Sequence, residues 1–506
     1  MSDIILGKEK VLGEKSATTS YRSIFKATSL FGGVQFWKIL IMIVQTKFVA
    51  VLLGPSGMGI KGLYSSAISL ILCITAMGLS NSAVRDVSLA YGSGDSKRVS
   101  HVIAVVRKLV WITGFLGMFT VIAMSPLLSK ITFGCYSYII PFIILSSSLL
   151  LSQLTTGQNV LLQGLRKLTY LAKAGVVGSL IGLFITVPLF YLLKTNGIVP
   201  ALVLDSLALF LIARYYAQKV KIEKTDVSFK EAIHDGKGMI GLGLVMTYNS
   251  MLVYGTSYIL RVFITQSTGV SDVGLFNAGF AVMNTYVGLI FTAMATDYYP
   301  RLAAVSNDNN ICKTIINQQM VVAILIIVPL MLFFLPIAPF AIIAIYSGEF
   351  LPIVSFIQWS SLGVCLKAIS WSISFYFIAK GDKKTFAINE TTINIVGLIM
   401  NIFGYKFWGI TGLGISSCVN HTIYVILVYM MAHYKYGFCI LSSVKKIIAI
   451  MMICLFILFL LLSIWKEWWV YVPAAFIVII GSLYAYKELS TRLGINLTVV
   501  RSMLKK

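Results

Sequence analysis

Long runs of apolar residues, separated by short polar stretches, dominate the chain. A membrane-spanning helix needs about 20 largely apolar residues, because each residue adds about 1.5 Å toward a hydrocarbon core about 30 Å thick. Fourteen segments meet this requirement. They cover residues 29–53, 62–84, 109–129, 139–162, 171–193, 198–216, 240–266, 274–299, 318–346, 352–379, 386–405, 409–432, 446–465 and 468–486. The pattern therefore predicts an all-α integral membrane protein with fourteen transmembrane helices.

Basic residues alternate between the two sets of loops that this pattern defines. If the N-terminus is cytoplasmic, the inner loops and tails hold 32 of the 41 Lys and Arg residues, and the outer loops hold five. Cytoplasmic loops of membrane proteins carry such an excess. We therefore expect both termini to lie in the cytoplasm. Every outer loop is short, so the chemistry of the protein is expected within the membrane.

Composition agrees with this picture and excludes other classes. Only 12% of the residues are charged, against roughly 25% in soluble domains, and the mean hydropathy is +0.88. The net charge of +23 is spread between the spans in small groups, which does not favour nucleic-acid binding. The seven cysteines have no metal-type or disulfide-type spacing, and residues 1–19 do not resemble a removable signal peptide.

Two short motifs recur at a nearly fixed distance along the chain. Gly54, Ser56 and Gly59 reappear as Gly269, Ser271 and Gly274, all three at the same offset in numbering. Residues 164–167 similarly correspond to residues 381–384 at nearly that offset, and residues 197–198 resemble residues 409–410. This recurrence predicts a duplicated six-helix unit. An even number of helices per unit makes the two repeats parallel, with a substrate cleft expected between them.

The repeat divides the chain into two pseudo-symmetric six-helix lobes, followed by two additional helices. The predicted parts are a cytoplasmic tail (1–22), an N-lobe (23–217), a cytoplasmic linker (218–237), a C-lobe (238–433), two further helices (434–486) and a second cytoplasmic tail (487–506).

Charged and amide side chains interrupt several predicted spans. An ionisable group near the bilayer centre costs about 2.5–3.5 kcal/mol on insertion scales, and it usually faces a water-filled cavity. On the first span, Gln35, Lys38 and Gln45 share one helix face, which we expect to line such a cavity. Lys47 lies on another face near the outer end, where its ammonium can reach either the cavity or the membrane interface.

The seventh span carries a polar and aromatic stripe at helical spacing. Its members are Thr247, Ser250, Tyr254, Tyr258, Arg261 and Thr265. Such a stripe suits a wet cavity, although Tyr also occurs at membrane interfaces. On the eighth span, Asn277 and Asn284 share a face and either bind ligand hydroxyl groups or join two helices. Lys367, on the tenth span, is a further cavity-lining candidate.

Acidic residues within the spans are fewer than basic ones. Asp205 and Glu390 are candidates for coupling to H⁺ or Na⁺, although Glu390 and Asp297 also lie where they can pair with cytoplasmic basic residues. His421 is expected to be packed and hydrogen-bonded. The excess of cations within the spans therefore calls for an anionic ligand. A pyrophosphate fits, because guanidinium and ammonium groups bind phosphate oxygens well.

Several short segments, taken in order, resemble one known family. They are Lys38 and Lys47 ahead of Leu53–Gly59, Ala83–Arg85, Arg261 ahead of Asp272–Gly274, Tyr298–Leu302, Leu366–Lys367, and Ala379–Lys380 ahead of Glu390. Over residues 20–435 the chain resembles the Wzx-like O-antigen flippases of the multidrug/oligosaccharidyl-lipid/polysaccharide (MOP) exporter superfamily.

The resemblance implies a flippase in the bacterial inner membrane, with its two six-helix lobes arranged in a V. Such a protein moves an undecaprenyl-pyrophosphate-linked oligosaccharide to the periplasmic leaflet by alternating access. It also implies that Lys38, Arg85, Arg261 and Lys367 occupy basic positions of the family. No metal or cofactor is expected, and the partners are the lipid-linked substrate, membrane lipids and a coupling H⁺ or Na⁺.

Three other functions are weighed against this one. A multidrug–cation antiporter of the same superfamily would carry acids rather than Lys and Arg in its cavity. A lipid II flippase would share both the fourteen helices and a cationic cavity. A membrane-embedded polysaccharide polymerase would be an enzyme and usually has a large external loop, which is not predicted here. The sequence shows no arrangement typical of catalytic residues, so we expect a non-enzyme.

Overall fold

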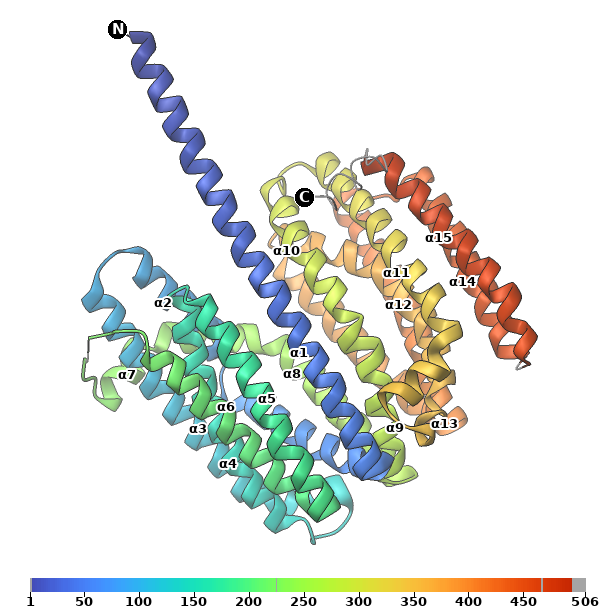
Figure 1. Cartoon of the computed structure of the whole chain (residues 1–506), viewed down its shortest axis with the longest axis horizontal. Helices are drawn as coiled ribbons and strands as arrows, with labels where there is room; N and C mark the ends of the chain where they lie inside the picture. The colour runs from blue at the N-terminus through green and yellow to red at the C-terminus, as the bar shows by residue number, and fades with distance from the viewer. Residues whose placement is uncertain (1, 224, 466, 494–506) are drawn as a thin grey trace. The chain divides into compact units, whose positions relative to one another are not determined.

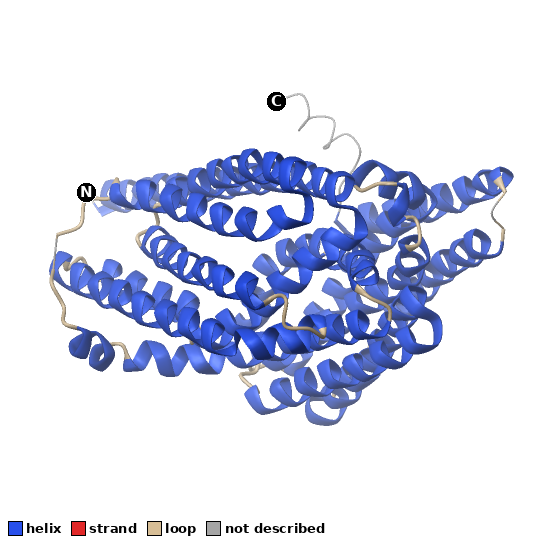
Figure 2. Ribbon diagram, turned by 90° about the horizontal axis from the view of Figure 1, so that it is seen from below, coloured by secondary structure: helices blue, strands red, loops and turns tan. Residues whose placement is uncertain are grey.

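A computed structural model of the chain describes residues 2–223, 225–465 and 467–493, without the side chains of residues 2–36, 245, 246, 286 and 296. The described residues form helices and no strand, which confirms the all-α prediction (Figure 2). The α-helices are α1 (Ser2–Thr75), α2 (Leu79–Gly92), α3 (Ser96–Phe133), α4 (Ile139–Gly164), α5 (Leu168–Leu193), α6 (Ile198–Gln218), α7 (Phe229–Asp235), α8 (Lys237–Ser267), α9 (Val270–Phe280), α10 (Gly288–Ala304), α11 (Asn309–Ile345), α12 (Ile353–Ala379), α13 (Lys383–Tyr436), α14 (Ser442–Ile464) and α15 (Tyr471–Leu493). Short helical turns η1 (Lys194–Gly197), η2 (Ala281–Tyr286), η3 (Gly348–Phe350) and η4 (Trp468–Val470) connect some of them.

Ten helical segments of the described chain are long and apolar enough to cross a membrane. Three of these segments, Trp37–Thr75, Leu168–Gln218 and Lys383–Tyr436, each overlap two of the predicted spans. They are 39, 51 and 54 residues long, well beyond the roughly 17–25 residues that one crossing needs. Every other predicted span also falls on described helix. The number of fourteen crossings remains a prediction.

Breaks in the long helices occur at matched positions of the two repeats. Gly54 interrupts α1 with φ 62° and ψ −171°, and Gly269 precedes α9 with φ 111° and ψ −179°. Lys194, after α5, has φ 48° and ψ −129°, and Gly409, within α13, has φ 56° and ψ −138°. The two pairs are separated by the same distance along the chain. The duplication is therefore visible in the backbone conformation as well as in the sequence.

A third matched break corrects one alignment made from the sequence. Arg166 and Gly381, which are related by the same offset as Gly54 and Gly269, have φ of 54° and 69°. After Arg166, the Lys167 amide bonds the Leu162 carbonyl at 2.8 Å; after Gly381, the Asp382 amide bonds the Phe377 carbonyl at 2.9 Å.

The sequence had aligned the glycines, Gly164 with Gly381 and Gly197 with Gly409. The backbone conformation instead aligns Arg166 with Gly381, and Lys194 with Gly409. A non-glycine residue at positive φ is uncommon. In each pair the two turns therefore share a backbone conformation although only one of them has glycine there.

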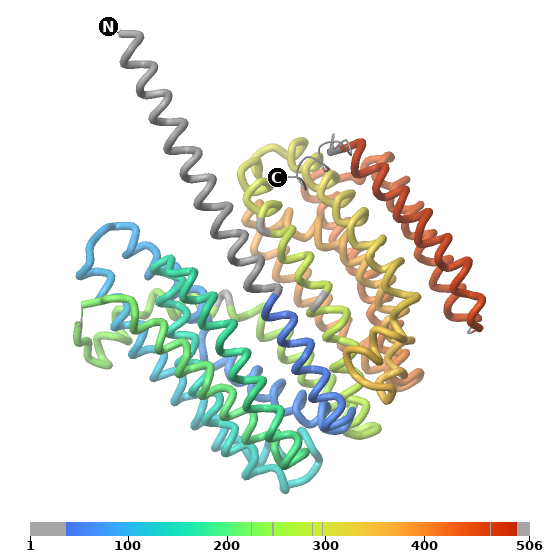
Figure 3. Tube along the Cα trace, viewed as in Figure 1, coloured from blue at the N-terminus to red at the C-terminus, as the bar shows by residue number. Residues whose placement is uncertain are grey.

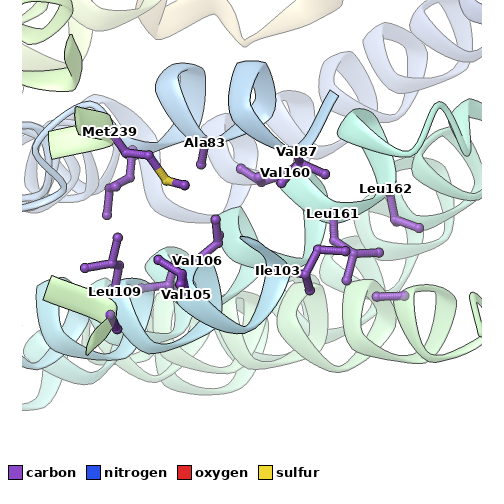
Figure 4. Packing of buried hydrophobic residues seen from close by; sticks show 14 of the residues in the cluster. Ala83, Val87, Ile103, Val105, Val106, Leu109, Val160, Leu161, Leu162 and Met239 are labelled. Atoms are coloured by element: carbon purple, nitrogen blue, oxygen red, sulfur yellow. The ribbon is translucent and has the colours of Figure 1, made fainter. Parts of the chain in front are cut away.

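The chain packs as two compact units, one formed by residues 1–53 and 64–251 and the other by residues 54–63 and 252–506. The first unit has a continuous apolar core from α2, α3, α4, the end of α6, α7 and the start of α8 (Figure 4). Ala83, Val87, Val106, Leu109 and Leu161 are among its buried members. The short helix α7 joins this core through Ala232, so the segment between α6 and α8 is packed rather than loose.

The second unit is built around α12, which packs against both α11 and α13. These helices form the yellow-to-orange part of Figures 1 and 3. Helices α14 and α15 pack against α11. Their outward side chains are apolar and exposed, for example Phe476 at 63% and Leu483 at 61%. Such faces suit a lipid solvent.

Two equivalent glycines of the repeat meet within the second unit. A Cβ atom added to Gly59 would lie 1.8 Å from the Val270 carbonyl oxygen, and one added to Gly274 would lie 1.8 Å from the Pro55 carbonyl oxygen. Pro55 and Val270 are themselves equivalent positions of the repeat, so the contact is reciprocal. Small residues allow this close approach of membrane helices. The motif that revealed the repeat thus also packs its two copies together.

We expect Gly274→Ala to destabilise the protein, because its Cβ would collide with main-chain atoms. Overpacking of this kind costs about 1–3 kcal/mol. Gly288 provides the matched control, since a Cβ there would meet nothing within 4 Å. Thermal unfolding in detergent should show a lower midpoint for Gly274→Ala than for Gly288→Ala. Equal midpoints would contradict the reciprocal contact.

The turn between α12 and α13 is held by Asp382. Its carboxylate accepts hydrogen bonds from the Thr385 amide at 3.1 Å, Lys435 Nζ at 2.8 Å and the Tyr436 hydroxyl at 2.7 Å. Partial burial raises the pKa of Asp382, but these donors outweigh that effect and hold the pKa below its usual range. The bonds connect the beginning of α13 to its end.

A depressed folded-state pKa stabilises the fold above the unfolded pKa of about 3.9, and the stabilisation is lost as pH falls through the folded pKa. Asp382→Asn should therefore lower the unfolding midpoint at pH 7, and its difference from wild type should shrink as pH falls below about 4. The exposed Asp226, replaced by Asn, serves as the control. A difference that stays constant from pH 7 to pH 3 would refute the ionic origin of this bond network.

Candidate functional site

A cavity of about 430 Å³ opens within the second unit, between α8, the α9–η2 segment, α12 and α13. Ligand cavities in proteins are typically about 300–1,000 Å³ and combine apolar walls with a few polar groups. Here the apolar wall comes mainly from Phe276, Phe280, Phe356 and Trp371. The polar groups come from all four surrounding segments. This cavity is our candidate functional site.

Two of the predicted site residues, Lys367 and Glu390, meet in this cavity. They come from α12 and α13 and attract each other electrostatically. The Lys367 ammonium also lies 5.5 Å from the centre of the Phe291 ring, within the range of a cation–π contact. The predicted Asn284 lines the same cavity from η2. Three residues predicted from three separate spans therefore line one cavity, and their role as a binding site stays a prediction.

Glu390 has a second partner in Tyr424. The Tyr424 hydroxyl donates to Glu390 Oε1 at 2.6 Å and lies 3.3 Å from Ser374 Oγ. The sequence leaves two roles open for Glu390, as an ion-coupling group or as a partner of cytoplasmic basic residues. The structure places it beside the intramembrane Lys367 and Tyr424 instead. A carboxylate held between a cation and a phenol is able to exchange a proton or bind a small cation.

Arg261 lies directly behind the cavity wall. Its Nε donates to Asn277 Oδ1 at 2.8 Å, and its Nη1 donates to the Ser257 carbonyl oxygen at 2.8 Å. The guanidinium carbon is 5.3 Å and 5.8 Å from the ring centres of Phe276 and Phe280. Ser257 and both phenylalanines line the cavity, whereas Arg261 and Asn277 do not. Asn277 was expected either to bind ligand hydroxyl groups or to join two helices. Its bond with Arg261 joins α8 to α9.

The predicted stripe on α8 is shifted by one residue from the face that lines the cavity. Val253, Thr256, Ser257 and Leu260 form the lining. Tyr254 is 45% exposed on the outside of the unit, and Tyr258 is 8% exposed and packed. The stripe and the lining face have the same helical spacing. The stripe is offset by one residue because the tyrosines were taken as its members.

The remaining candidates lie in the first unit. The Lys38 ammonium lies against Gly175 of α5, where an added Cβ would be 2.2 Å from Nζ. Gln45 Nε2 donates to Thr186 Oγ1 at 3.2 Å. The Asp205 carboxylate of α6 lies against Gly182, whose added Cβ would be 2.0 Å from Oδ1.

The other candidates of this unit are less enclosed. Arg85 is exposed on α2, and Lys47 is partly exposed on α1. The side chain of Gln35 lies outside the described residues.

Several polar residues of the cavity were not selected from the sequence, four of them with larger side chains. Asn394, Asn401, Asn420 and Tyr424 all belong to α13. Together with Glu390 and His421 they follow helical spacing on either side of the break at Gly409. A scan for amide groups along the two predicted spans of this helix would have found the three asparagines. His421, expected to be hydrogen-bonded, has no partner at Nδ1 among the described residues.

A larger cavity of about 840 Å³ lies in the first unit, at the ends of α2, α4 and α6. Exposed Lys167, Lys219 and Lys221 line it. None of the predicted site residues belongs to it. Size alone therefore does not make it the candidate site.

Comparison with solved structures places this architecture in a known class. An inward-facing multidrug-resistance MATE transporter of the MOP superfamily is 16% identical, with a TM-score of 0.67 over 81% of this chain and 96% of that chain. The lipid II flippase MurJ, in an inward closed conformation, is 14% identical, with a TM-score of 0.68 over 92% and 100%. A MOP transporter from Pyrococcus furiosus is 15% identical, with a TM-score of 0.53 over 80% and 94%.

These likenesses and the ten apolar helical segments define a multi-pass membrane protein with the fold of the MOP transporters. The model of a family described as polysaccharide biosynthesis proteins matches residues 48–355. That match covers more than half of the chain, so the chain belongs to this family. No curated protein matches the sequence significantly. The fold expected from the resemblance to the MOP exporters is thus confirmed.

Proposed function

We propose that the protein is a flippase for an undecaprenyl-pyrophosphate-linked oligosaccharide of the O-antigen repeat-unit type. It would carry this lipid from the cytoplasmic to the periplasmic leaflet of the bacterial inner membrane by alternating access. Both termini would be cytoplasmic. Membership of a polysaccharide biosynthesis family and a fold shared with transporters support this proposal.

The observation that carries the proposal is a cation enclosed in a polar cavity within the second unit. Lys367 lines the cavity, and Arg261 lies behind its wall. A pyrophosphate offers the negative charge that balances such groups, and ammonium and guanidinium groups bind its oxygens strongly. An inward-negative membrane potential also favours outward movement of an anion, by about 2.3 kcal/mol per charge per 100 mV.

Two alternative functions within the superfamily can be weighed against the same cavity. A cationic drug would be repelled by Lys367 and attracted only by Glu390, so multidrug export is the weaker reading. A lipid II flippase is closer, because MurJ shares this fold over its full length and lipid II also carries a pyrophosphate. Lipid-linked oligosaccharides of different composition, tested side by side, would separate these two substrates.

We propose that Glu390 couples transport to H⁺ or Na⁺, with Asp205 of α6 as the second candidate. Glu390 is the stronger candidate for ion coupling, because it lines the same cavity as Lys367, the proposed partner of the pyrophosphate. Asp205 belongs to the first unit, where it lies against Gly182 of α5, and it does not line that cavity.

Replacing Lys367 with Met should remove the cavity cation while nearly preserving side-chain shape. We expect surface polysaccharide to fall at least about tenfold, the change that about 1.4 kcal/mol of lost binding produces. Lys367→Arg should restore a part of it, and Lys445→Ala, at the exposed start of α14, should have no effect. Surface polysaccharide is measured in cells with membrane abundance checked by immunoblot. Arg261→Ala provides a second test, and full surface polysaccharide in both cation variants would refute the proposal.

Replacing Glu390 with Gln should abolish stimulation by an ion gradient. Translocation of a fluorescent polyprenyl-pyrophosphate disaccharide would be followed in proteoliposomes, with an imposed H⁺ gradient, an imposed Na⁺ gradient or neither. We expect wild type to respond to one gradient and Glu390→Gln to keep only the gradient-free rate. Asp297→Asn, at a carboxylate that is 82% exposed, serves as control. Unchanged stimulation of Glu390→Gln would assign coupling elsewhere.

A further inference from the structure

Two buried polar atoms at the cavity lack hydrogen-bond partners. Asn420 Oδ1 and His421 Nδ1 are inaccessible to solvent and unpaired among the described residues, and both residues line the cavity. An unsatisfied buried polar atom costs about 1–3 kcal/mol, and such atoms are rare in native proteins. Two adjacent ones at one wall indicate that the cavity is built to accept a polar ligand.

The chemistry of these atoms indicates which polar group the ligand carries. Asn420 Oδ1 is an acceptor and requires a donor. His421 Nδ1 is an acceptor in one neutral tautomer and a donor in the other. A hydroxyl group both donates and accepts, so it satisfies either state of the imidazole. Ammonium ions only donate and carboxylates only accept, so neither fits both positions equally.

The other polar groups of the cavity repeat this preference. Asn284, Asn394 and Asn401 contribute amides from further positions around the wall, and each amide offers two donors and one acceptor oxygen. Ser370 and Ser417 contribute hydroxyls. The lining therefore suits a ligand with several hydroxyl groups pointing in different directions, rather than a single charged group.

An aromatic surface completes the cavity. Trp371 lies on its wall, and its ring is held by Phe375, Phe291 and Tyr298 at centroid distances of 5.0, 5.4 and 5.6 Å. A ring fixed in this way presents a rigid apolar face at little entropic cost. A ligand with an apolar face and a polar edge is what such a wall accommodates. A pyranose ring has both, because its axial C–H bonds form a face and its hydroxyls form the rim.

We propose that this cavity is a sugar-binding subsite that takes one or two pyranose rings, with Trp371 as the stacking surface and Asn420 and His421 as hydroxyl partners. The inference rests on the proposed function, since it assigns the sugars of the transported lipid to this cavity. Lys367, which lines the same cavity, then lies beside the sugar and binds the adjoining phosphate. The site recognises the carbohydrate by hydroxyl pattern and ring stacking, and the phosphate by charge.

The direct test is binding of methyl glycosides to the full chain in lipid nanodiscs, measured by saturation-transfer NMR. The panel contains the methyl glycosides of glucose, galactose, mannose and N-acetylglucosamine. The matched control probe is 2-methoxytetrahydropyran, which keeps the ring and lacks the hydroxyls. At least one glycoside should bind saturably and the control probe should not. Binding of no glycoside, or equal binding of the control probe, would overturn the subsite and leave a water-filled cavity.

Variants place the bound sugar. Trp371→Leu and Asn420→Ala should each weaken glycoside binding about tenfold or more, corresponding to about 1.4 kcal/mol. Trp359→Leu is the matched tryptophan control, because Trp359 belongs to the same helix but packs on Phe459 at 4.7 Å and does not line the cavity. Asn310→Ala, on the exposed first turn of α11, is the amide control. Weakening by the controls alone would overturn the assignment.

Further measurements distinguish failure of the sugar-binding subsite from failure of the proposed flippase function. Inorganic pyrophosphate binding, measured by calorimetry on the same nanodiscs, should be lost in Lys367→Met and kept in Trp371→Leu. If no glycoside binds while Lys367→Met still abolishes surface polysaccharide, the subsite is wrong and the flippase stands. If glycosides bind at Trp371 while surface polysaccharide is unaffected by the loss of Lys367, the flippase is wrong. In that case the cavity is a carbohydrate site with another purpose.

Discussion

A chain surrounded by hydrocarbon must satisfy its own backbone hydrogen bonds, and this constraint governs the rest of the structure. Only continuous helices meet it within one segment, so the described chain is helical throughout and leaves the helix at few points. Three pairs of these points recur at one constant offset, at Gly54 and Gly269, at Arg166 and Gly381, and at Lys194 and Gly409. The two members of each pair share a positive φ although their residues differ in two of the three pairs. The reciprocal packing of Gly59 and Gly274 follows from the same duplication.

The same constraint explains how the intramembrane charges are housed. Arg261 is enclosed by Asn277, the Ser257 carbonyl and two phenylalanine rings, which replace part of the hydration of its guanidinium. Lys367 has a carboxylate and an aromatic ring nearby. A buried charge persists only where partners offset its desolvation. The partners around Arg261 close its site, whereas those around Lys367 leave an open cavity. The open site is therefore where a ligand anion has access.

Sequence reasoning predicted the features that depend on hydrophobicity and helical period. The helices, the internal repeat, and the intramembrane position of Lys367 and Glu390 all follow from the one-dimensional pattern. The pattern does not contain the rotation of a helix about its axis, and for this reason the stripe on α8 was assigned to the wrong face. It also does not show which distant side chains meet. Asn277 and Arg261, or Glu390 and Tyr424, are joined by packing between helices. The breaks at Arg166 and Lys194 were not predicted, because a positive φ leaves no signal in the sequence when the residue is not glycine.

Lys367 connects the parts of the proposed mechanism, because two different anions compete for it. Without ligand, Glu390 is the nearby carboxylate that offsets its charge. When a phosphate binds Lys367, Glu390 loses part of that stabilisation and gains affinity for a proton or a small cation. By linkage the reverse also holds, since an ion on Glu390 makes Lys367 more available to phosphate. The coupling free energy is reciprocal and requires no movement to transmit it. One lysine beside one glutamate thus gives the cavity a physical reason to bind its ion and its anionic substrate together.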